Sequence, residues 1–215
     1  MRKITVHTLF GLLTASLMLT SAWAAGAVNI TPNMANVDIV YHGKKIRIER
    51  NQNQDNKLVN SFSKTSRKCP PFCIQPTKVA PGVDTVSEID LLYFLMTRVK
   101  DKTGLLIDAR VESFYEKGTI PGSVNIPFTT FTKDVTDPAL AAALKQIGVK
   151  ESGLGDWDFT NAKPLILWCN GPWCGQSPRA IKGLLALGYP PSLLYYYRGG
   201  MQMWQILGLT TVPGK

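Results

Sequence analysis

Histidine is almost absent from this sequence of 215 residues, which has only His7 and His42. His7 lies in a stretch that we interpret below as a targeting segment. Zinc sites rich in histidine are therefore excluded, and a serine-histidine-aspartate triad would depend on His42 alone. Charged residues are also few, at 18%, whereas apolar residues make up 45%. This balance excludes a disordered chain, and the length predicts one main domain with a smaller extension.

No charged residue lies between His7 and Asp38. Arg2 and Lys3 precede an apolar run, and Ala22-Trp23-Ala24 has the small-x-small pattern that a signal peptidase cleaves. We expect residues 1–24 to be a signal peptide and the mature protein to be exported. The alternative is an uncleaved leader, which would be the chain's only contact with a membrane. Serine and threonine dilute the run, so a spanning helix is the weaker interpretation.

Residues 25–81 are predicted to form an extension with a β-hairpin. Apolar and polar residues alternate over 37–41 and 45–49, on either side of His42-Gly43. The stretch from residue 41 to 68 contains eight basic and two acidic residues. A solvated face is the favoured interpretation, and an electric field that attracts anions or an acidic partner is the alternative. We expect no nucleic-acid binding, because no base-reading motif is present.

Residues 82–215 show the alternation of strands and helices that predicts an α/β domain with a mostly parallel sheet. Thr85 and Glu88 have the spacing of a capping box, followed by a helix with Met96 on its apolar face. Strands are expected over 105–108, 124–126, 165–168 and 193–197. Further helices are expected over 139–147, 177–187 and 201–207, each ended by a glycine.

The loop after the apolar run 165–168 contains the residue types that sulfur chemistry needs. In open α/β sheets, ligands bind beyond the carboxyl ends of the strands, where Cys169 lies. Backbone N–H groups and a helix dipole would favour its thiolate, so we expect a lowered pKa and a nucleophile that needs no histidine. A buried structural cysteine is the alternative. The other candidate site residues are Asn170, Gly171, Pro172, Trp173, Cys174, Gly175, Gln176 and Ser177.

Several motifs in order make the sequence resemble the rhodanese (sulfurtransferase) family. They are residues 105–110, 115–127, the Cys169 loop with its helix, Gly188-Tyr189 and 198–204. The resemblance spans about residues 85–212. It implies that Cys169 takes a sulfane sulfur from a donor, holds it as a persulfide and yields it to a thiophilic acceptor, without a metal or another cofactor. It also implies a periplasmic location and, as partner, a small sulfur-containing anion or a protein persulfide or thiol.

The sequence departs from the rhodanese pattern within the loop. In many active members the fifth residue after the cysteine is Arg, where this chain has Cys174, and the helix is expected to begin about two residues later. Thiosulfate is therefore open as the donor, and a phosphatase or arsenate reductase stays a minor alternative. Arg179 lies in the helix, and two orientations stay open for it, toward the pocket or away from it. Thr119 replaces the histidine of a Gly-His-Ile-Pro-Gly motif, and Asp108 and Arg110 are expected to be structural.

Cys174 adds a second mechanism, because its thiol could attack a persulfide on Cys169, releasing sulfide and leaving a disulfide. Cys69 and Cys73 are expected to form a local disulfide, which an oxidising compartment permits, with a two-sulfur copper site as the alternative. Two alternatives to a sulfurtransferase therefore stay open. One is a thiol-disulfide oxidoreductase that uses Cys169 and Cys174. The other is a non-catalytic rhodanese-like binding or carrier module whose partner docks on the basic extension.

Overall fold

The computed structural model describes residues 26–153 and 155–214, so the predicted signal peptide lies outside the described residues. A five-stranded sheet forms the centre, with the order β3-β9-β8-β4-β5 and parallel pairing between all neighbours. Its strands are β3 (Asp84–Val86), β4 (Leu105–Asp108), β5 (Ser123–Asn125), β8 (Leu165–Trp168) and β9 (Leu194–Tyr197). The predicted α/β class with a mostly parallel sheet is confirmed.

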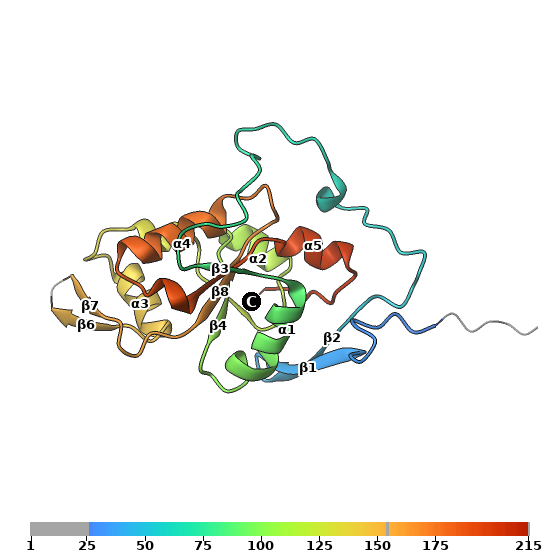
Figure 1. Cartoon of the computed structure of the whole chain (residues 1–215), viewed down its shortest axis with the longest axis horizontal. Coiled ribbons are helices and arrows are strands. Elements are labelled where there is room, and N and C mark those ends of the chain that lie inside the picture. The colour runs from blue at the N-terminus through green and yellow to red at the C-terminus, as the bar shows by residue number, and fades with distance from the viewer. Residues whose placement is uncertain (1–25, 154, 215) are drawn as a thin grey trace, which may run out of the picture.

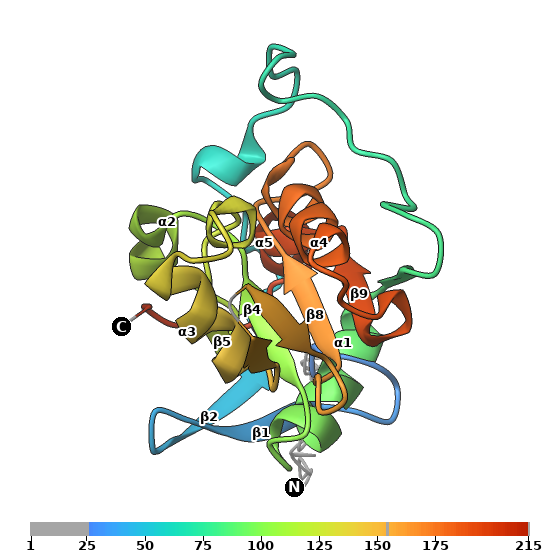
Figure 2. The same cartoon turned by 90° about the vertical axis from the view of Figure 1, so that its left-hand side faces the viewer.

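Helices cover both faces of this sheet. Helices α3 (Pro138–Gln146) and α4 (Gln176–Ala186) pack on one face, and α1 (Glu88–Phe94) and α5 (Gly200–Ile206) pack on the other (Figure 2). Strand β8 is buried along its whole length, with alternate side chains in the two core clusters. A strand enclosed on both sides is a continuous apolar run in the sequence, which is why β8 was predicted with the correct bounds.

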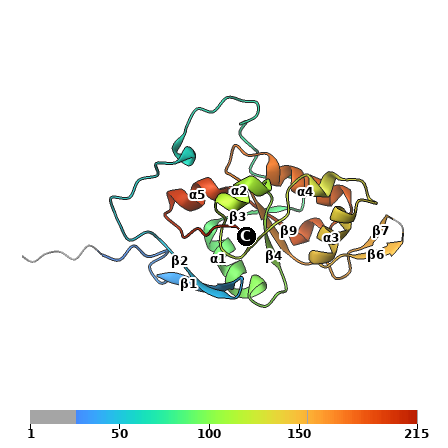
Figure 3. The same ribbon diagram turned by 180° about the vertical axis from the view of Figure 1, so that it is seen from behind.

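The N-terminal hairpin consists of β1 (Asn36–Tyr41) and β2 (Lys44–Glu49), paired antiparallel around a turn at His42 and Gly43. Val37, Ile39 and Ile48 are buried in the same core cluster as the helices on the α1 face. The hairpin lies beside α1, on the far side of the molecule from the small hairpin of β6 (Lys150–Gly153) and β7 (Asp156–Asp158) (Figure 3). Its apolar face is thus part of the core of the main domain.

The remaining elements are short and were not predicted. They are α2 (Glu112–Lys117), β6 (Lys150–Gly153), β7 (Asp156–Asp158) and the 3-10 turns η1 (Ser61–Ser63), η3 (Thr130–Thr132) and η4 (Pro191–Leu193). Segments of this kind bury too few apolar residues to show a clear period. The turn η2 (Leu95–Val99) lies where the sequence predicted helix, but it is π-helical. None of the helices over 26–153 and 155–214 has the length and hydropathy of a membrane span.

The start of α1 differs from the prediction. Thr85 lies in β3, where it pairs with Tyr196, so it does not cap the helix. The N-cap is Ser87, whose backbone N–H donates to Asp90 Oδ2 at 2.9 Å. Beyond α1 the chain continues into the π-helical turn η2, which shifts the helical register. Met96 is therefore 39% exposed, whereas the sequence placed it on the apolar face.

The chain between β2 and β3 forms a long connection that leaves the hairpin, arches away from the body and returns to the sheet (Figure 1). We call residues 60–77 of this connection the arm. Within the arm, Cys69 and Cys73 are joined in a disulfide. The arm returns past the end of the sheet at which β8 meets α4, and this is the end where the candidate site lies.

Candidate functional site

Cys169 and Cys174 lie on the turn between β8 and α4, at the carboxyl end of the central strand. Both are free thiols and both are buried, with 2% and 5% of the residue exposed. Cys169 follows directly on the last residue of β8, and α4 begins at Gln176 after the N-cap Gly175. The helix thus starts one residue earlier than predicted. Strand and helix together place the two sulfurs at the first turn of α4.

Hydrogen bonds hold each sulfur. Ser177 Oγ donates to Cys169 Sγ at 3.0 Å, and the Cys169 thiol donates to the Cys174 carbonyl at 3.2 Å. Asn170 Nδ2 lies 3.9 Å from Cys174 Sγ, at the outer limit for a sulfur acceptor. The backbone N–H groups of Asn170 and Gln176 also face Cys174. The loop therefore directs hydrogen-bond donors at both sulfurs, and Cys174 receives more of them than Cys169.

The two thiols have opposite pKa shifts. Burial, followed by interaction with Cys174, raises the pKa of Cys169 well above its ordinary value. Interaction with the Cys169 side chain, aided by the N–H groups of Gln176 and Asn170, lowers the pKa of Cys174 to about 7 despite its burial. The expected lowering of the Cys169 pKa is therefore wrong. The pair holds one negative charge near neutral pH, with the thiolate at Cys174 and the proton at Cys169.

This charge distribution predicts the pH dependence of alkylation. Iodoacetamide reacts with thiolates, so we expect its rate with the native protein to rise with a midpoint near pH 7 as Cys174 ionises. In Cys174→Ser the remaining thiol, Cys169, stays buried, and the midpoint should move above the ordinary thiol value of about 8.5. Mass spectrometry after timed quenching gives both rates. A wild-type midpoint near 8.5 would contradict the assignment.

The start of α5 fixes the loop from the other side. The N–H groups of Met201 and Gln202 donate to the carbonyls of Cys169 and Asn170 at 2.9 and 3.0 Å. Gly200, with φ of +56°, packs so closely that a Cβ there would lie 2.3 Å from the Cys169 carbonyl oxygen. No other residue fits without moving the loop. The Gly199-Gly200 pair thus allows α5 to position the reactive turn.

A buried ion pair supports Asn170. Arg110 Nη2 donates to Asp108 Oδ2 at 2.6 Å, with both side chains at most 2% exposed. The same guanidinium lies over the Trp168 ring, and its Nη1 reaches Asn170 Oδ1 at 3.4 Å. Thr119 Oγ1 also donates to Asp108, at 3.0 Å. Because Arg110 contacts the amide oxygen of Asn170, the amide nitrogen is turned toward Cys174.

The arm packs on Trp173, the residue before Cys174. Phe72, which lies between the two disulfide cysteines, meets the Trp173 ring edge-on at 5.4 Å between centroids. The Arg67 guanidinium lies over Trp173 at 4.3 Å and over Phe72 at 5.0 Å. Trp173 Nε1 in turn donates to Gln202 Oε1 at 2.6 Å. An aromatic and cationic cluster therefore covers one side of the loop.

Gln75 attaches the returning end of the arm to the loop. Its N–H donates to the Pro172 carbonyl at 2.8 Å, and its own carbonyl accepts from Arg198 Nη2 at 2.9 Å. Arg179 does not replace the missing loop arginine, because it is exposed and lies over the Phe128 ring at 4.1 Å. Arg67 belongs to the basic run noted in the sequence, but its contact with Trp173 and that of Gln75 with Pro172 join segments about 100 residues apart, and Gln75 was not predicted.

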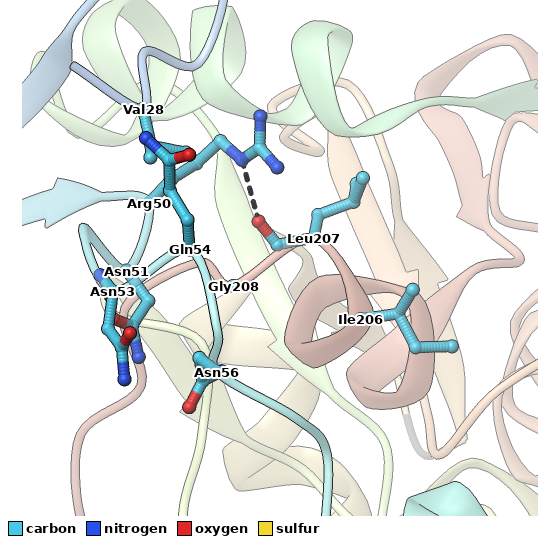
Figure 4. Close-up of a pocket in the computed structure, with 9 residues that line it drawn as sticks. All are labelled: Val28, Arg50, Asn51, Asn53, Gln54, Asn56, Ile206, Leu207 and Gly208. Atoms are coloured by element: carbon cyan, nitrogen blue, oxygen red, sulfur yellow. Dashed lines mark hydrogen bonds between the residues drawn. The ribbon is translucent and has the colours of Figure 1, made fainter. Parts of the chain in front are cut away.

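The basic run of the extension is distributed over several contacts. Lys45 and Arg47 both pair with Asp38, and Arg50 Nε donates to the Leu207 carbonyl at 2.9 Å. Arg50 also lines a cavity of about 330 Å³ between the polar stretch after β2 and the end of α5 (Figure 4). This cavity contains no residue of the Cys169 loop. Among these contacts, only that of Arg67 reaches the loop.

Potential metal ligands do not gather in the described part of the chain, where no three His, Cys, Asp or Glu side chains are placed to share an ion. The chemistry that the loop offers is that of two adjacent thiols. Both are buried, Cys174 has the lower pKa and Cys169 the higher, and serine and backbone donors surround them.

Comparison with known proteins gives one family. Residues 93–207 match the family model described as the rhodanese-like domain. Among solved structures, a Bacillus halodurans protein is 17% identical over 60% of this chain and 77% of its own, with a TM-score of 0.44. The human single-domain sulfurtransferase is 23% identical (58% and 96%, TM-score 0.39), and the thiosulfate sulfurtransferase of Pseudomonas aeruginosa is 18% identical (62% and 21%, TM-score 0.40). No curated protein matches the sequence.

Proposed function

Because the chain belongs to the rhodanese-like domain family, we propose that it is a sulfurtransferase that transfers sulfane sulfur through a persulfide on Cys169. The single observation on which this proposal rests is the pair of free thiols at the carboxyl end of β8, where Ser177 Oγ donates a hydrogen bond to Cys169 Sγ. The signal peptide and the periplasmic location remain part of the proposal.

In the first step, Cys174 acts as the base for Cys169. Its thiolate takes the Cys169 proton while the Cys169 sulfur attacks the outer sulfur of a donor such as thiosulfate or a persulfide. The donor's S–S bond breaks, and sulfite or a thiolate leaves with the electron pair. Cys169 then holds a persulfide. Ser177 Oγ, which donates to Cys169 Sγ, remains placed to stabilise its inner sulfur.

In the second step, a thiophilic acceptor removes the sulfur. A nucleophile such as cyanide, sulfite or a thiolate attacks the outer sulfur, and the electron pair of the S–S bond returns to Cys169. Cys174 gives the proton back, so the enzyme is unchanged after the cycle. Burial of both thiols favours this route, because it keeps water and unrelated thiols from the persulfide.

A sulfur donor can reach Cys169 only if the arm, which lies over the loop, moves. Cys169 is 2% exposed, and Trp173, which precedes Cys174 in the same loop, is in contact with Phe72 of the arm. The arm is attached around the loop by the edge-on contact of Phe72 with Trp173 and by hydrogen bonds, among them those of Gln75 N–H to the Pro172 carbonyl and of Gln202 Nε2 to the Phe62 carbonyl. We propose that the arm lifts from Trp173 to admit the donor.

Intact-mass measurement tests the proposed function. The wild-type protein is incubated with thiosulfate, and separately with polysulfide, and then freed of the donor. We expect a gain of one sulfur atom per chain that disappears on addition of cyanide, with thiocyanate as product. A mass that never changes under either donor would contradict the proposal and favour a non-catalytic binding or carrier module instead.

A thiol-disulfide oxidoreductase is the second candidate, because Cys174 has the pKa of a reactive redox thiol and adjoins Cys169. In that mechanism Cys174 attacks Cys169 of the persulfide, hydrosulfide leaves, and a Cys169–Cys174 disulfide forms. Cys174→Ser separates the two candidates. A sulfurtransferase should retain slow transfer to cyanide, about 10 to 100 times below wild type for loss of a general base. An oxidoreductase should lose its turnover entirely.

A further inference from the structure

Tyr196 on β9 has a hydroxyl group without a hydrogen-bond partner in the described part of the chain, although the residue is 0% exposed. Other buried tyrosines are paired: Tyr197 donates to Glu88 Oε1 at 2.8 Å, and Tyr189 donates to the Lys163 carbonyl at 2.5 Å. An unpaired buried hydroxyl destabilises a fold, and in a native structure it calls for an explanation. A partner present only during function is one such explanation.

The strand register places Tyr196 beside the thiol pair. It lies opposite Leu167 of the neighbouring β8, and both residues belong to the core cluster on the α4 face. Cys169 comes two residues after Leu167, so it continues the same side of the strand, and its sulfur contacts Ser177 of α4. The long side chain of Tyr196 thus lies on the same face of the sheet as Cys169.

Electrostatics agrees with this placement. Burial raises the pKa of Tyr196 most and the neighbouring Cys169 sulfur raises it next, whereas Arg198 lowers it and Cys174 raises it again. The hydroxyl group therefore keeps its proton and remains a donor throughout the neutral range. Negative charge on either sulfur would raise the pKa of this hydroxyl group. A neutral donor that faces a site of developing negative charge is suited to stabilise that charge.

We propose that the Tyr196 hydroxyl donates a hydrogen bond to the outer sulfur of the Cys169 persulfide, so that Ser177 and Tyr196 together bind the sulfane sulfur. This inference rests on the proposed function. Forming the persulfide extends the Cys169 side chain by an S–S bond of about 2 Å and moves the negative charge to the new atom. Ser177 remains bonded to the inner sulfur, and the outer one gains Tyr196 as its donor.

The lifetime of the persulfide tests this assignment. Wild type, Tyr196→Phe and Tyr197→Phe are loaded with thiosulfate or polysulfide, freed of donor, and followed by intact mass while a fixed low concentration of cyanide removes the added sulfur as thiocyanate. For Tyr196→Phe we expect loss about tenfold faster, as for removal of one hydrogen bond to a charged group. Its melting temperature should be equal to wild type or higher, because only an unpaired hydroxyl is removed.

Tyr197→Phe is the matched control on the same strand. Tyr197 belongs to the core cluster on the opposite face and is bonded to Glu88, so its variant should melt at a lower temperature and keep the wild-type persulfide lifetime. Equal lifetimes in wild type and Tyr196→Phe would overturn the assignment and leave the proposed function intact. A wild type that never gains sulfur would overturn both.

Discussion

Replacing Cys169 by serine is expected to abolish sulfur transfer. Serine is nearly the same size, and its hydroxyl can still accept from Ser177, so the fold should be retained. A hydroxyl, however, neither ionises near neutral pH nor forms a stable bond to a sulfane sulfur. We expect the rate of thiocyanate formation to fall by roughly a thousandfold or more, as for loss of other enzymatic nucleophiles. A colorimetric thiocyanate assay measures this rate.

The remaining thiol supplies the internal control for this variant. Cys174 keeps its backbone donors in Cys169→Ser, so it should still react with iodoacetamide and show that the loop is folded. Unchanged transfer in Cys169→Ser would mean that Cys174 is the sulfur carrier. The melting temperature of Cys169→Ser should equal that of wild type, which would show that the variant has lost its chemistry and not its structure.

Arg110→Met is expected to lower the free energy of unfolding more than any other substitution proposed for this protein. The guanidinium neutralises the fully buried Asp108, packs on Trp168 and donates to the Gly118 carbonyl. Removing it leaves a buried carboxylate without its charged partner, which costs about 3–5 kcal/mol in other proteins. Urea denaturation followed by tryptophan fluorescence gives the change in the free energy of unfolding. The variant should also raise the pKa of Cys174, because Asn170 loses the contact that orients it.

Lys133→Met is the matched control for the charge. Lys133 pairs with Asp137 at 2.9 Å, but both side chains are partly exposed, so water replaces the lost partner. We expect a denaturation midpoint close to that of wild type. A similar midpoint for Arg110→Met would contradict the role assigned to the buried pair.

The sequence predicted the elements that are buried either on all sides or on one regular face. Strands β4 and β8 are continuous apolar runs enclosed by helices, and the hairpin alternates because one side faces the core. Strand β3 was missed, since three residues at a sheet edge show no period. The cap of α1 was misplaced because Thr85 and Ser87 both begin acceptable capping patterns, and only the strand pairing of Thr85 decides between them.

The position of the candidate site was predictable, but its electrostatics was not. Cys169 and Cys174 were identified from the loop's place after a buried strand. The order of their pKa values depends on which sulfur receives more donors and how deeply each is buried, and both follow from tertiary packing. Arg67, Gln75 and Tyr196 approach the loop from distant segments, so spacing in the sequence gives no signal for them.

Locating the added sulfur within the chain tests the central claim most directly. The protein is treated with thiosulfate or polysulfide, alkylated under non-reducing conditions and digested between the two loop cysteines, and the peptides are sequenced by tandem mass spectrometry. The account predicts the extra sulfur on Cys169, with Cys174 alkylated directly. An extra sulfur found on Cys174, with Cys169 unmodified, would contradict it.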